Sequence, residues 1–199
     1  MLLKKVSHVA LLLVLMLSCG TLYASAAPIL SLDPSSLVVQ PGQNFSLDVR
    51  NAGVTDLYAF QFDLAFDPFI LSATSVTEGP FLLGCGPGCF SEGTIDTIAG
   101  TIASIADTLA GPVVGVNGSG TVATVTFHAL ALGTSPITLS NVILLDSHLG
   151  DIPASTADGA VTVQAATGVP EPTTWLLLAT GCVGLLGYAW LCRQQPASP

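Results

Sequence analysis

Between residues 27 and 164 the chain alternates apolar and polar positions in short runs, which Gly, Pro, Asn and Asp residues interrupt. Alternation with a period of two is typical of strands that bury one face, and no run of useful length has the periodicity of a helix. The clearest run, 57–67, has one face of large apolar residues: Tyr58, Phe60, Phe62, Leu64 and Phe66. Such a stripe is far more often core than ligand platform. The pattern predicts one all-β sandwich domain over 27–164.

Shorter runs predict the remaining strands. They cover 29–32, 37–39, 45–49, 70–76, 94–98, 101–106, 121–129, 136–145 and 160–163. Residues that favour turns separate them: we expect a turn at 117–120, and 51–55 lies between two predicted strands. Alternation along 121–129 places Val125 and Phe127 in the interior. Four residues of this strand are then expected to face outward as a candidate binding face: Val122, Thr124, Thr126 and His128. A merely solvated face is the alternative.

The amino terminus has the features of a secretory signal peptide. Two lysines precede an apolar run, and the small residues Ala24 and Ala26 predict cleavage before Ala27. Residues 1–26 are therefore expected to be removed on export. A lipoprotein signal that ends at Cys19 is the less favoured alternative.

The carboxyl terminus carries a Pro-Glu-Pro segment and then a long apolar run. The segment consists of Val169, Pro170, Glu171 and Pro172, and its prolines prevent a helix from running back into it. We expect a linker over 165–172, a transmembrane helix over 173–193 and a cytoplasmic tail over 194–199. The uncharged stretch spans about 25 Å, close to the lower limit for crossing a bilayer, and Arg193 favours a cytoplasmic carboxyl terminus. A buried core helix is the alternative.

This tail resembles the PEP-CTERM sorting signal. The resemblance rests on the Pro-Glu-Pro segment, the apolar run and the basic residue Arg193, although members of this family end in several arginines and here Gln194 and Gln195 follow. It implies processing by an exosortase-type enzyme of a Gram-negative bacterium. It also implies that the membrane-anchored protein is then delivered to the cell surface or the extracellular matrix.

The charge of the predicted domain restricts its partners. Residues 27–169 contain 12 acidic residues and one basic residue, Arg50. Nucleic acid is excluded as a partner because phosphate binding requires basic clusters. A solvated acidic surface explains this composition. The loop from Asp146 to Asp151 offers oxygen ligands for calcium, but it lacks the alternating Asp and Asn residues of a calcium-binding loop. We predict no cofactor and no metal, with calcium as the alternative.

Two of the five cysteines, Cys85 and Cys89, lie in the predicted domain. They bracket a Gly-Pro-Gly turn within the long loop 77–93. In an oxidising compartment such a pair is best interpreted as a small disulfide in a surface flap. A metal site is disfavoured because no histidine or second cysteine pair lies nearby in the sequence.

The sequence offers no constellation that favours an enzyme. Asp63 and Asp67 share one strand face but lie about 13 Å apart at 3.4 Å per residue, which is more than a pair of glycosidase carboxylates allows. The Gly-x-Ser-x-Gly elbow of serine hydrolases does not occur, and the domain has only His128 and His148 to serve as bases. We predict a non-catalytic protein.

Five motifs in the strand pattern resemble the cohesin domain. They are Leu64 to Pro68, Ala99 to Ala103, Gly118 to Phe127, Ile137 to Val142 and Asp158 to Val163. The resemblance covers nearly the whole predicted domain. It implies a nine-stranded jelly-roll sandwich, related to carbohydrate-binding modules, that binds dockerin domains. We therefore expect a binding module for a dockerin-like protein or a polysaccharide, and a structural matrix protein without a discrete ligand is the alternative.

Overall fold

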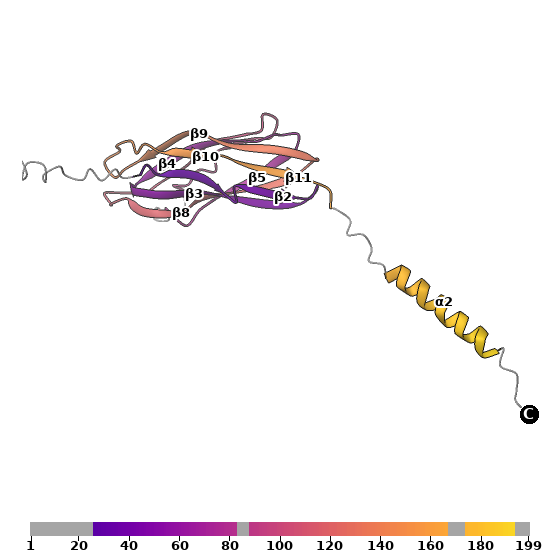
Figure 1. Ribbon diagram of the computed structural model, residues 1–199. Coiled ribbons are helices and arrows are strands. Elements are labelled where there is room, and N and C mark those ends of the chain that lie inside the picture. Colours follow the sequence, from indigo (N-terminus) through magenta and orange to yellow (C-terminus); the bar gives the residue numbers. More distant parts are fainter. Residues whose placement is uncertain (1–25, 83–87, 167–173, 194–199) are drawn as a thin grey trace, which may run out of the picture.

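The computed structural model describes residues 26–82, 88–166 and 174–193. Two β-sheets stack face to face (Figure 1), one with the strand order β10-β1-β3-β8-β5 and one with the order β2-β11-β9-β4-β7-β6. The first sheet contains β1 (Ile29–Asp33), β3 (Asn44–Leu57), β5 (Leu71–Glu78), β8 (Val116–Ala129) and β10 (Ser155–Ala157). The second contains β2 (Ser36–Val39), β4 (Ala59–Ala65), β6 (Thr94–Asp96), β7 (Thr101–Thr108), β9 (Gly133–Leu145) and β11 (Gly159–Val163). The predicted all-β sandwich is confirmed.

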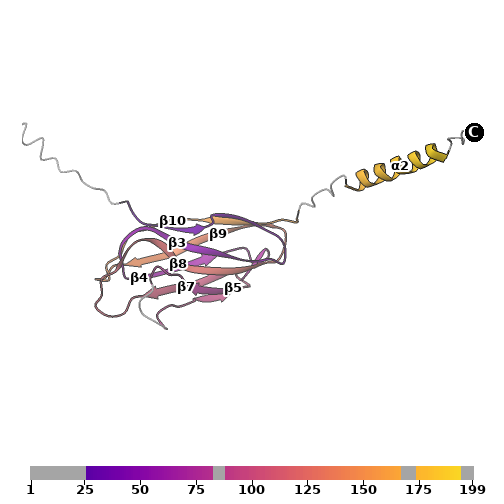
Figure 2. The same ribbon diagram turned by 90° about the horizontal axis from the view of Figure 1, so that it is seen from below.

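The core lies between the two sheets, with β3 and β8 on one side and β4 and β7 on the other (Figure 2). Phe62, Leu64 and Phe127 are fully buried. The ring of Phe127 meets that of Phe66 edge-on at a centroid distance of 5.4 Å, and it stacks on Phe45 at 5.7 Å. The predicted stripe is therefore confirmed as core at four of its five positions, and the fifth residue, Tyr58, is partly buried against that core.

Two strands are longer than the alternation predicts. β3 runs through 51–55, which the pattern places between two strands, and β8 runs through 117–120, so the predicted turn there is wrong. The two segments pair with each other through register shifts. Gly53 and Gly118 adopt φ values of 74° and 118° there, a region that favours glycine. Gly53 and Gly118, which suggest turns in the sequence, instead allow β3 and β8 to stay paired across the register shifts.

Val122 is buried, although the alternation predicts that it faces solvent. Its side chain is 1% exposed, whereas Thr121 is partly exposed. Against β3 the register steps from Ala123 directly to Thr121, so β8 bulges at Val122. The bulge shifts the alternation by one residue and turns Val122 into the core. The candidate binding face thus loses this residue and keeps its three polar ones.

The carboxyl-terminal run forms a helix, α2 (Thr174–Arg193). This helix covers most of the predicted range, and residue 173 lies outside the described residues. Among the helices of the described residues, however, none combines the length and the hydropathy that crossing a membrane requires. The prediction that this helix spans a membrane is not supported.

Several predicted features lie wholly or partly outside the described residues. These are the signal peptide up to Ala24, one cysteine of the Cys85–Cys89 pair, and the sorting segment Val169, Pro170, Glu171 and Pro172. Ala26, Ala27 and Cys89 are described, but the rest of each feature is not. The cleavage site, the disulfide and the sorting segment stay predictions.

Candidate functional site

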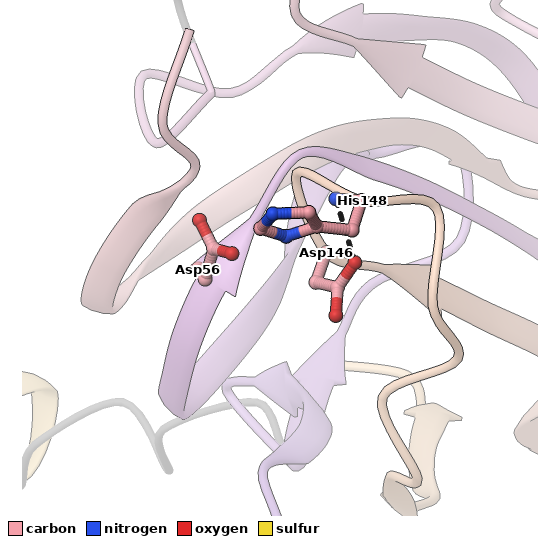
Figure 3. Close-up of side chains that lie close together, drawn as sticks. All are labelled: Asp56, Asp146 and His148. Atoms are coloured by element: carbon pink, nitrogen blue, oxygen red, sulfur yellow. Dashed lines mark hydrogen bonds between the residues drawn. The ribbon is translucent and has the colours of Figure 1, made fainter.

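Three side chains of types that can bind a metal ion lie close together where β3 and β9 end (Figure 3). Asp56 comes from the end of β3, and Asp146 and His148 come from the loop that follows β9. One ligand atom of each residue lies within 4.8 Å of those of the other two. Within the described residues this is the one group of three or more His, Cys, Asp or Glu side chains with that spacing.

Asp56 joins three separate segments. Its Oδ1 accepts the N–H of Gly115 at 2.7 Å, and its Oδ2 accepts the hydroxyl of Ser147 at 2.7 Å and the N–H of Ser147 at 3.3 Å. These hydrogen bonds, with the Ser147 hydroxyl first and the Gly115 N–H second, hold the pKa of Asp56 below its usual value. Gly115 has to be glycine, because a Cβ there would lie 2.4 Å from the Asp56 carbonyl carbon. The carboxylate is thus ionised and fixed in place.

Asp146 organises its own loop. Its Oδ1 accepts the N–H groups of His148 and Gly150, each at 2.8 Å. The loop closes through a hydrogen bond from the Asp146 N–H to the Gly150 carbonyl at 2.9 Å. A side chain at Gly150 would collide with Oδ2 of Asp146, which lies 2.8 Å from the position of its Cβ. Both ends of the loop therefore direct this carboxylate and the histidine toward Asp56.

The sequence identified only part of this cluster. Asp146 and His148 belong to the loop considered for calcium, but its last residue, Asp151, pairs instead with Leu145 in an isolated β-bridge. Asp56 was missed because 90 positions separate it from Asp146, and no local motif marks it. Only the stacking of the two sheets brings these residues together.

The polar residues of the predicted β8 face bond to neighbours within their own sheet. Thr124 donates to Asp48 at 2.7 Å, the hydroxyls of Thr126 and Ser46 lie 3.1 Å apart, and Nδ1 of His128 lies 2.6 Å from Oδ1 of Asn44. Cross-strand pairs of this kind stabilise a sheet. The polar side chains of this face therefore already have hydrogen-bond partners within their own sheet.

The outer face of the other sheet has a shallow cleft of about 310 Å³ with a mostly apolar lining. β4, β7 and β9 contribute to it. The lining includes Ala59, Gln61, Ala106, Thr108 and Ile143. Ile143 is 44% exposed, and the alanines on the neighbouring strands leave room beside it. Sequence reasoning missed this surface because it is assembled across three strands.

The two carboxylates considered for hydrolysis hold backbone groups instead. Asp63 accepts the N–H of Ser104 at 2.7 Å and a hydrogen bond from the Asn141 side chain. Both of those residues have positive φ values and mark register shifts in the strands beside β4. Asp67 accepts the N–H of Phe69 at 2.9 Å and so stabilises its own turn. These contacts give the two carboxylates separate structural roles.

Asp107 is a buried acid in β7. Its side chain is 3% exposed, and its Oδ1 accepts the N–H of Thr108 at 2.7 Å. Within the described residues its Oδ2 is buried without a hydrogen-bond partner. Burial raises the pKa of Asp107 to about 6; the Thr108 N–H opposes this increase and the carboxylate of Glu78 adds to it.

Comparison with known families decides what this sandwich is. Residues 31–163 match the family described as the cohesin domain. This chain belongs to the cohesin family. Cohesin domains are non-catalytic binding modules, which agrees with the prediction of a protein without enzymatic activity.

Solved cohesins have the same fold. The seventh ScaB type I cohesin of Pseudobacteroides cellulosolvens has 18% identity and a TM-score of 0.59, and the match covers 73% of this chain and 97% of that one. A non-cellulosomal cohesin of Archaeoglobus fulgidus has 14% identity and a TM-score of 0.59, with 71% and 94% covered. A type I cohesin–dockerin complex of Clostridium thermocellum has 14% identity and a TM-score of 0.60, with 69% and 99% covered. At these identities the likeness establishes the fold.

The tail of this cohesin has a match of its own. Residues 168–194 match the PEP-CTERM protein-sorting motif, which confirms the resemblance drawn from the Pro-Glu-Pro segment. Among curated proteins, no sequence matches the chain.

Proposed function

We propose that this cohesin domain is an exported, surface-sorted module that binds a dockerin-like protein. The match of 31–163 to the cohesin family carries the proposal, and a solved neighbour in complex with a dockerin supports it. The sorting motif at 168–194 supports delivery to the cell surface or the extracellular matrix. A polysaccharide is the less favoured partner, because the solved neighbour in complex holds a dockerin and both tryptophans, at 175 and 190, lie outside the domain.

In this proposal the partner docks on the cleft formed by β4, β7 and β9. Protein interfaces place exposed apolar side chains at their centre, where water is excluded. The cleft offers Ile143 for this purpose, with the small side chains of Ala59 and Ala106 beside it. The polar residues of the β8 face already bond to one another, so a partner would gain little by contacting them.

Replacing Ile143 by lysine is expected to weaken dockerin binding by at least about 30-fold, the effect of losing a hot-spot contact. The matched control is Thr126→Lys, which puts the same side chain on the outer face of β8 and should leave the affinity unchanged. Both positions are partly exposed, so the melting temperature should change little. Calorimetric titration with dockerins encoded in the same genome measures both variants.

Loss of binding in Thr126→Lys with retention in Ile143→Lys would move the interface to β8, the face predicted from the sequence. A failure of every dockerin to bind the unmodified protein would favour the alternative, a structural matrix protein without a discrete ligand.

Export should remove both ends of the chain. We expect the mature protein to begin at Ala27, and we expect an exosortase-type enzyme to cleave near the Pro-Glu-Pro segment, because prolines keep that segment extended and accessible. Intact-mass measurement of the protein recovered from the cell surface checks both ends. A mass that still includes the run from Trp175 to Leu191 would contradict processing at the sorting motif.

A further inference from the structure

The Asp56, Asp146 and His148 cluster places two carboxylates together without a basic partner. Arg50 is the one lysine or arginine between residues 27 and 169. It pairs with Asp33 at 2.8 Å and is therefore engaged elsewhere. Two neighbouring carboxylates repel each other unless a positive charge lies between them. Hydrogen bonds from Ser147 and Gly115 stabilise the Asp56 carboxylate, but no lysine or arginine of the domain adds a full positive charge to the cluster.

Donor atoms in the cluster remain available for a cation. Asp146 uses Oδ1 for two backbone N–H groups. Among the described residues, Oδ2 of Asp146 and Nε2 of His148 have no hydrogen-bond partner. The backbone and Ser147 fix the two carboxylates from behind, as the outer shell of a metal site orients its ligands. The surrounding hydrogen bonds thus orient the two carboxylates before any ion binds.

The donor set indicates which kind of cation fits. Calcium prefers six to eight oxygen ligands, whereas one imidazole nitrogen with two carboxylates is a typical zinc donor set with a fourth position left for water. Zinc bonds these atoms at about 2.0 to 2.2 Å, so two ligands of a tetrahedral site lie about 3.3 to 3.6 Å apart. The three donors lie within 4.8 Å of one another. Because His148 is exposed, its side chain has room to turn toward an ion that the two carboxylates hold.

We propose that Asp56, Asp146 and His148 bind a divalent transition-metal ion of the zinc type. The ion ties the end of β3 to the loop after β9 and, through the Gly115 hydrogen bond of Asp56, to the loop before β8. The proposal does not depend on the proposed function, although Leu145, which precedes Asp146 in the chain, lines the cleft. Its role is to stabilise one end of the sandwich.

Zinc should raise the melting temperature of the tag-free, chelator-treated protein. At about a hundredfold excess over the dissociation constant we expect an increase of about 5 to 10 °C. Calcium and magnesium at the same concentration should have little effect. A competition titration with a chromophoric chelator measures zinc affinity and stoichiometry directly, and we expect one site per chain.

Two variants and two controls locate the site. His148→Gln and Asp146→Asn should each weaken zinc binding at least tenfold; Asn keeps an oxygen that can accept the loop N–H groups, so the fold should persist. His128→Gln removes the other histidine of the domain, and Asp151→Asn changes a carboxylate of the same loop outside the cluster. Both controls should bind zinc as the unmodified protein does.

Three results would overturn the proposal. They are the absence of a zinc-induced shift and of titratable binding, equal zinc affinity in His148→Gln and the unmodified protein, and stabilisation by calcium without stabilisation by zinc. Should Asp146→Asn fail to fold, the titration of His148→Gln alone decides between the proposal and its rejection.

Discussion

Replacing Phe127 by alanine is expected to lower the free energy of unfolding by about 4 kcal/mol. Phe127 is fully buried at the centre of the sandwich, where its ring packs against Phe66 from the opposite sheet and Phe45 from its own. Alanine would leave a cavity that the surrounding strands cannot close. Chemical denaturation at neutral pH measures the change.

The matched control is Phe69→Ala. Phe69 is the same residue type, but it is 83% exposed in the turn before β5, so its loss should change stability by no more than about 0.5 kcal/mol. Equal effects of the two substitutions would contradict the assignment of the core.

Replacing Asp107 by asparagine is expected to stabilise the protein at pH 7.5 by about 2 kcal/mol, less than the full pKa difference implies because solvent screens part of the charge. The pKa of Asp107 is about 6 in the folded protein, against 3.8 as its ordinary value. Ionisation therefore costs more in the folded state than in the unfolded state. Asparagine retains the acceptor for the Thr108 N–H, carries no charge, and places a donor where the unpartnered oxygen lies.

The pH dependence follows from the same difference. Between pH 3.8 and 6 the folded state holds a proton on Asp107 that the unfolded state has released. The contribution of Asp107 to the free energy of unfolding is therefore greatest below pH 3.8 and falls as the pH rises toward 6. Chemical denaturation should show a lower free energy of unfolding at pH 7.5 than at pH 4. In Asp107→Asn this difference should largely disappear. The exposed Asp151→Asn serves as the control. A variant that is less stable than the unmodified protein at pH 7.5 would contradict a buried, uncompensated charge.

The strand pattern could be predicted because alternation reports burial residue by residue. The core face of β4 follows directly from the stripe at 57–67. The pattern failed where local geometry breaks the period of two. Val122 is buried because a bulge shifts the alternation, and Gly53 and Gly118 continue strands that their turn preference seemed to end. Sequence alternation alone does not reveal a bulge, since it depends on the partner strand.

The candidate sites were less accessible from the sequence. The loop with Asp146 and His148 could be singled out because its polar residues are consecutive. Asp56 could not, because β3 and β9 lie in different sheets and only the stacking of the sheets brings it within reach. The cleft combines alanines and Ile143 from three strands, and none of these residues carries a chemical signature. A surface built from several strands can be predicted only when the pairing register of those strands is known.

The central claim is that this cohesin binds a dockerin-like protein through the cleft of β4, β7 and β9. Backbone chemical-shift mapping by NMR, with the labelled protein titrated with an unlabelled dockerin, tests it most directly. The account predicts the largest shift changes at Gln61, Ala106 and Ile143, with little change along the outer face of β8. Changes centred on Thr124 and Thr126, or no change with any dockerin, would contradict it.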